Sequence, residues 1–121
     1  MNYWARRKFG SKKAYGKNLL NDLYSESIQF GANYRKPIIN IVKELCPCMS
    51  QKEQKELADY IEFVRGSIED YIYKGYYNKY KDNFEKLQKK SKQFIKKEYS
   101  WMNSHNIGHA ISQGIYFAWR G

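Results

Sequence analysis

Apolar side chains recur every three to four residues along most of the chain, which is the spacing of one face of an α-helix. The first stripe begins at Asn18 and is predicted to end near Gly31, because glycine readily adopts the left-handed conformation of a helix C-terminus. Pro37 suits the first position of a second helix, and Pro47 is expected to terminate it. The two stripes consist of Leu19, Leu20, Leu23, Tyr24, Ser27 and Ile28, and of Ile38, Ile41, Val42 and Leu45.

A third helix is predicted to start after Ser50, with Glu53 three residues later as in a capping box. Its apolar pattern continues toward Trp101, but one helix over 51–101 would be about 75 Å long, which exceeds a compact domain of this size. We therefore expect a turn or sharp kink near Gly75. A last helix is predicted to begin at Asn103 or Ser104 and to carry Ile107, Ile111, Ile115 and Trp119.

No segment alternates apolar and polar residues with a period of two, so strands are not expected. The sequence predicts an all-α protein, a small helical bundle of four or five helices over residues 18–121, preceded by an arm over residues 1–17. The predicted core contains Leu23, Ile28, Ile41, Val42, Leu45, Leu57, Ile61, Val64, Ile68, Ile72, Phe84, Leu87, Ile111 and Ile115.

Charge is unevenly distributed along the 121 residues, which carry a net charge of +10. Residues 1–17 carry +6 and residues 73–97 carry +7, whereas residues 44–72 between them carry −4. Two basic blocks around an acidic one are typical of a protein that meets a polyanion with part of its surface. The alternative is that the lysines only keep a helical surface soluble, since net charge does not define a function.

The composition excludes several function classes. No run of apolar residues is long enough for a transmembrane helix, and the N-terminus lacks the apolar segment of a signal peptide. No nucleophile motif or phosphate-binding loop is present, and acid pairs such as Glu53 and Glu56 fall where helix surfaces normally carry charge. We therefore expect no enzymatic activity and no cofactor.

Two pairs of metal-ligating residue types occur. His105 and His109 are four residues apart on one helix face, and Cys46 and Cys48 flank Pro47. Together they have the donor types of a zinc site, but the C-x-C spacing is not the usual one, so we expect no metal and interpret them as ordinary helix-end residues.

The N-terminal arm combines aromatic rings with cations and contains no acid. Cations neutralise phosphates, and rings stack or pack along a groove, so the arm is predicted to bind nucleic acid without reading sequence. The predicted binding residues of the arm are Tyr3, Trp4, Arg6, Arg7, Lys8, Phe9, Lys12, Lys13, Tyr15 and Lys17.

This arm, YWARRKFGSKKAYGK, followed by a small helical bundle resembles the coat proteins of filamentous double-stranded DNA viruses of archaea. The resemblance covers the architecture of the whole chain. It implies a structural protein of the virion that wraps double-stranded DNA independently of sequence and assembles with itself or with a related coat subunit. It also implies that the DNA-contacting part extends to residue 36, which adds Arg35 and Lys36.

The last helix carries a stripe of small residues, Ala110, Gly114 and Ala118, which allows another helix to approach closely. That helix could belong to the same chain or to another subunit, and with Trp119 alongside we predict an assembly surface. A different class of function is also open: a cytoplasmic helical binding protein, such as a bacteriocin immunity protein or a phage-encoded inhibitor of host defence. A peripheral membrane protein is a third possibility, because its helices are basic and amphipathic.

Overall fold

The structure, a computed structural model, describes residues 15–29 and 36–120. The predicted arm therefore lies outside the described residues except for Tyr15, Gly16 and Lys17. The described residues contain helices and no strand, which confirms the predicted all-α fold.

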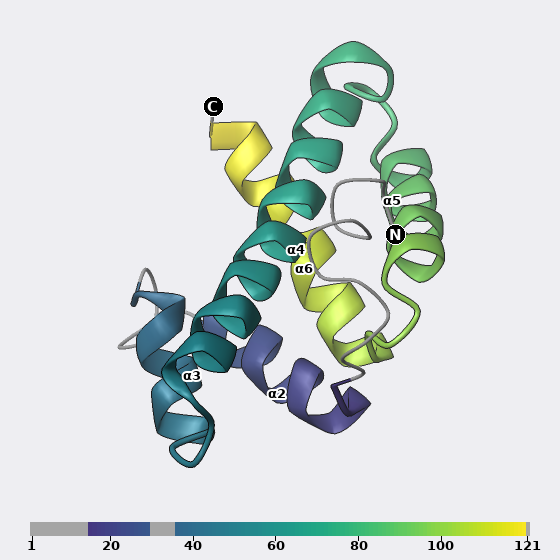
Figure 1. The fold of residues 1–121 in the computed structure, drawn as a ribbon. Helices are drawn as coiled ribbons and strands as arrows, with labels where there is room; N and C mark the ends of the chain where they lie inside the picture. Colours follow the sequence, from purple (N-terminus) through teal and green to yellow (C-terminus); the bar gives the residue numbers. More distant parts are fainter. Residues whose placement is uncertain (1–14, 30–35, 121) are drawn as a thin grey trace. The chain divides into compact units, whose positions relative to one another are not determined.

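Five helices follow one another along the described part of the chain (Figure 1). They are α2 (Lys17–Ser27), α3 (Ile38–Leu45), α4 (Gln51–Asn78), α5 (Phe84–Glu98) and α6 (Ser104–Arg120). No helix among these residues is long and apolar enough to cross a bilayer.

Short polar side chains define the starts of the three longest helices. The Ser50 hydroxyl accepts a hydrogen bond from the Glu53 backbone N–H at 3.2 Å, as the capping box predicts. The Asn83 side chain accepts from the Lys86 N–H at 3.1 Å. The third is Asn103, which accepts from the Asn106 N–H at 2.9 Å. Each bond satisfies a backbone donor that has no partner inside the helix, so these boundaries are encoded locally.

The prediction for Pro47 is confirmed, because α3 ends at Leu45, two residues before it. Pro37 is the N-cap of α3, one residue before the first helical position that the sequence predicted for it. The turn that follows α3 is tied to α4, because the Gln54 side-chain amide donates to the Cys46 carbonyl at 2.9 Å. Helix α2 ends at Ser27, earlier than the predicted end near Gly31, which lies outside the described residues.

The turn expected near Gly75 is present, but it begins four residues later. Helix α4 continues to Asn78, and the turn occupies residues 79–83. A Cβ atom on Gly75 would lie 2.9 Å from Cδ1 of Leu87, so this glycine permits the close approach of α5. Its carbonyl accepts hydrogen bonds from the N–H groups of Lys79 and Tyr80, at 3.1 and 2.8 Å, where the helix ends.

The chain divides into two compact units within α4, one up to Val64 and the other from Arg65. The single domain over 18–121 stays a prediction. In the first unit α2 and α3 contact each other. The buried apolar side chains of the first unit are Leu20, Leu23, Tyr24, Ile28, Ile38, Ile41, Val42, Leu57, Ala58, Tyr60, Ile61 and Val64.

The second unit contains the end of α4 together with α5 and α6. Helices α5 and α6 contact each other. The ring of Phe94 on α5 stacks on Tyr71 of α4 at 4.2 Å between ring centroids. The hydroxyls of Ser67 and Tyr99 also share a hydrogen bond. The buried apolar side chains of the second unit are Ile68, Ile72, Tyr76, Leu87, Ile95, Tyr99, Met102, Ile107, Ala110, Ile111 and Ala118.

Three predicted core residues are not buried. Leu45 and Phe84 are exposed, because Leu45 is the last residue of α3 and Phe84 the first residue of α5. Ile115 is half-buried at the edge of the packed face of α6. The other predicted core residues are buried as expected.

Candidate nucleic-acid interface

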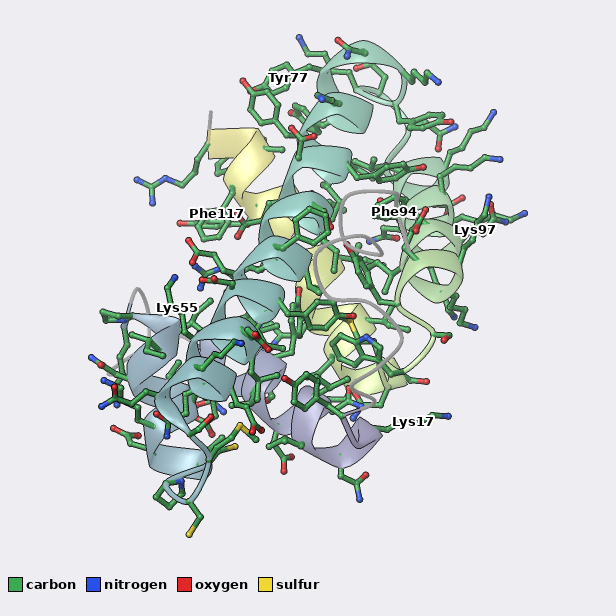
Figure 2. The ribbon with its side chains drawn as sticks, in the orientation of Figure 1. Lys17, Lys55, Tyr77, Phe94, Lys97 and Phe117 are labelled. Carbon is green, nitrogen blue, oxygen red and sulfur yellow. The ribbon has the colours of Figure 1, made fainter. Side chains whose placement is uncertain are left out.

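Helix α5 has one buried face and one lysine face. Leu87, Ser91 and Ile95 are buried and recur every four residues, which fixes the rotation of the helix. Figure 2 shows Lys97 on the outer side of α5, away from Phe94 on the inner side. Lysines make up six of the fifteen helix residues. We call them the lysine face: Lys86, Lys89, Lys90, Lys92, Lys96 and Lys97.

All these lysines are exposed except Lys90, which is half-buried. No ion pair to a described residue neutralises any of them. Elsewhere, by contrast, Lys74 lies 3.0 Å from Asp70 and Lys55 lies 3.4 Å from Asp59. The lysine face is therefore a concentration of positive charge that no ion pair within residues 15–29 and 36–120 neutralises.

The spacing of these charges suits a polyanion. At 1.5 Å per residue, the lysine face extends about 16 Å along α5, so a cation occurs about every 3 Å. Each strand of duplex DNA carries one negative charge per about 3.4 Å of the helix axis, which is close to this spacing. Residues 65–120 contain eleven Lys and Arg against five Asp and Glu, so the second unit as a whole adds to the same field.

The turn before α5 extends this positive surface. Lys79 and Lys81 are exposed there. The Lys86 ammonium lies 5.8 Å from the centroid of the Tyr80 ring, a cation–π geometry that keeps the charge near the turn. Aromatic rings and cations are thus combined in this turn as well as in the arm.

Of the predicted nucleic-acid-binding residues, the structure describes Tyr15, Lys17 and Lys36. Tyr15 is half-buried, and Lys17 is exposed at the first position of α2. Lys36 is half-buried and pairs with Glu44, so an intramolecular carboxylate already neutralises it. The other residues predicted to bind nucleic acid, including Arg35, lie outside the described residues.

The predicted assembly surface is corrected by the structure. Ala110, Gly114 and Ala118 are buried, and a Cβ atom on Gly114 would lie 2.6 Å from Cδ1 of Ile72. The small residues therefore allow α6 to pack on α4, which is the intramolecular interpretation of the stripe. Only Trp119 of the four predicted residues is on the surface, with 65% of its area exposed.

Neither the histidine pair nor the cysteine pair belongs to a larger set of metal ligands among the described residues. The His105 and His109 rings lie 6.4 Å apart, and both cysteines are free thiols. No group of three or more His, Cys, Asp or Glu side chains that could hold a metal occurs among the described residues. Burial raises the pKa of the Cys46 thiol, which disfavours the thiolate that a metal would require.

No protein-family model, curated protein or solved structure matches this chain. The function of this chain is therefore inferred from its own residues. The sequence places the 73–97 lysines in a basic block, but the arm was predicted as the principal site. The signal that identifies the lysine face is the spacing of lysines opposite Leu87, Ser91 and Ile95, which requires the rotation of α5 to be known.

Proposed function

We propose that this protein is a structural protein that binds nucleic acid independently of sequence, with the lysine face of α5 contacting phosphates. The observation that carries the proposal is six lysines on one 15-residue helix, without an ion pair to any described residue. Releasing condensed counterions from nucleic acid would favour binding at each phosphate that such a cation neutralises.

The residue types favour backbone contact over base recognition. Lysine presents a compact charge on a flexible stem, whereas arginine presents the planar donors that pair bidentately with guanine. Helix α5 contains no arginine, asparagine or aspartate, and its side chains of the base-reading amide class are the exposed Gln88 and Gln93. The expected interaction therefore fixes position along the phosphates and discriminates little between sequences.

The wider proposal is that binding serves to coat double-stranded DNA in a filament. It is supported by the resemblance in architecture stated above and by the basic composition of residues 1–17, which would add a second set of phosphate contacts. The exposed Trp119 is available for contact with a neighbouring subunit. A coat protein of this kind should form filaments with duplex DNA, which negative-stain electron microscopy would detect.

The lysine face is tested by replacing Lys89, Lys92 and Lys96 with glutamine. Glutamine has a helix propensity similar to that of lysine, so α5 should remain helical. Each lost phosphate contact reduces the slope of log K against log[salt] by about 0.9, so the triple variant should lose about 2.7 of the slope on duplex DNA. Fluorescence anisotropy over a series of salt concentrations measures this slope.

A matched control removes the same number of charges elsewhere. Lys43, Lys52 and Lys55 are exposed on α3 and α4, in the region where acids predominate. Their replacement by glutamine should leave the slope nearly unchanged. If both triple variants lose the same slope, only net charge matters and the proposed lysine face is wrong.

A further inference from the structure

Four aromatic rings surround the end of α4 and the start of α5. Tyr73, Tyr77 and Phe84 have 49%, 42% and 47% of their area exposed, whereas Tyr76 between them retains only 8%. We call Tyr73, Tyr76, Tyr77 and Phe84 the aromatic tip. Figure 2 shows Tyr77 at this end of α4. Three large rings are therefore presented to solvent around a buried one.

The rings hold one another in position. The Phe84 ring lies 6.0 Å from Tyr76 with an interplanar angle of 26°, and the edge contact between Tyr76 and Tyr77 is 4.9 Å. Tyr73 lies 4.7 Å from Tyr77, and the Tyr77 hydroxyl donates a hydrogen bond to the Ala118 carbonyl at 2.8 Å. These are favourable separations for aromatic pairs. The rings are therefore already held in place, and they lose little conformational entropy when a ligand binds.

The surroundings of the aromatic tip are basic. Lys79 and Lys81 lie in the turn between the two helices, and Lys86 is in the first turn of α5. Residues 75–90 contain five lysines against Asp82 and Glu85. A ligand that complements this surface carries negative charge and also presents flat faces to the rings.

We propose that the aromatic tip stacks an unpaired base of single-stranded nucleic acid, with Phe84 as the principal contact. This inference rests on the proposed function, because the phosphates of the same strand would lie on the lysines of the turn and of α5. Phe84 already stacks on Tyr76, so a base on the outer side of its ring extends an existing stack. Duplex bases have their faces covered by neighbours, which restricts the contact to unpaired strands. Stacking accepts every base, so sequence independence is retained.

The test compares a single-stranded thymidine oligonucleotide with a duplex of equal length at one salt concentration. Phe84→Ala should weaken single-strand binding about tenfold and leave duplex binding unchanged. Phe84→Leu keeps an apolar side chain without a π-face and should show the same loss. Both variants should fold, because Phe84 is exposed at a helix end, and circular dichroism checks this.

Tyr116→Ala is the matched control. Tyr116 is also an exposed ring beside a cation, with the Arg120 guanidinium 5.8 Å from its centroid, but it lies on α6. This variant should bind both oligonucleotides as the parent protein does. Photocrosslinking with an iodouracil-containing single strand, mapped by mass spectrometry, should modify the aromatic tip and spare Tyr116.

Several results would overturn the inference. One is that Phe84→Ala weakens binding to duplex and to single strand equally. Another is that Phe84→Leu binds the single strand as tightly as the parent protein does. The third is that Phe84→Ala leaves the affinity for both nucleic acids unchanged. An effect of Phe84→Ala confined to binding of phosphatidylserine vesicles would assign the tip to a membrane surface instead. The lysine triple variant separates the two proposals. If it reduces the salt slope while Phe84→Ala changes nothing, the base-stacking inference fails and the proposed function stands.

Discussion

Gly114 provides a quantitative test of how α6 packs on α4. A Cβ atom at this position would lie 2.6 Å from Cδ1 of Ile72 and 3.4 Å from its Cβ and Cγ2 atoms, and Ile72 is fully buried. Adding a methyl group to a filled core costs about 1–3 kcal/mol, whereas exchanging glycine for alanine within a helix contributes about 1 kcal/mol of stability. Gly114→Ala should therefore destabilise the protein by about 1 kcal/mol, within a range of about 0 to 2 kcal/mol.

Gly108 in the same helix is the matched control, because a Cβ atom there meets nothing within 4 Å. Gly108→Ala should stabilise the protein by about 1 kcal/mol through helix propensity alone. The propensity contribution cancels between the two variants, so their difference of about 1–3 kcal/mol isolates the steric contact with Ile72. Urea denaturation followed by circular dichroism measures both free energies of unfolding.

A second substitution tests whether Ile72 is the cause. Ile72→Val removes Cδ1, so in that background the difference between the Gly114 and Gly108 variants should shrink by about 0.5 kcal/mol or more. If Gly114→Ala stabilises as much as Gly108→Ala, α6 does not pack on α4 at this point. A change in oligomeric state with unaltered monomer stability would instead restore the small-residue stripe as an assembly surface.

Other predictions follow from burial, charge and thiol chemistry. Leu87→Ala should cost about 2–5 kcal/mol in urea denaturation, because Leu87 is fully buried, whereas Leu45→Ala at the exposed end of α3 should cost little. Deleting residues 1–14 should reduce the salt slope on duplex DNA by about 4.5 if each of its five cations contacts a phosphate, and an unchanged slope would exclude the arm. In a Cys48→Ser variant, iodoacetamide should modify Cys46 at about pH 8 more slowly in the folded than in the urea-unfolded chain, because burial raises its pKa; equal rates by mass spectrometry would contradict this.

Periodicity predicted the fold class because helix formation here depends on local spacing and capping. The capping residues can be recognised in the sequence itself, as with Ser50 and Glu53 at the start of α4 and Asn103 at the start of α6. The turn expected near Gly75 begins at residue 79 instead, and the reason for this shift is different. A glycine that ends a helix and a glycine that admits a neighbouring helix look the same in sequence, and only the position of Leu87 distinguishes them.

The same limitation applies to the predicted surfaces. The stripe around Gly114 predicted a close helix neighbour, but sequence could not identify Ile72 of the same chain as that neighbour. In the segment YKGYYNKY, Tyr76 is buried and Tyr77 is exposed, although both are tyrosines in adjacent positions. Tyr76 continues the four-residue spacing of the buried Ile68 and Ile72, so its burial follows from the helical pattern once α4 is known to continue past Gly75.

The packing at Gly75 connects the fold to the proposed binding surface. Leu87 occupies the space that a side chain on Gly75 would fill, and it is fully buried there. Because Leu87, Ser91 and Ile95 share one face of α5, seating Leu87 directs the lysine face to the opposite side. The Asn83 cap fixes the first residue of the same helix, which places Phe84 beside Tyr76. Gly75 and the Asn83 cap thus orient both the phosphate-binding and the base-stacking residues that we propose. The two surfaces therefore both depend on how α5 is placed against the end of α4.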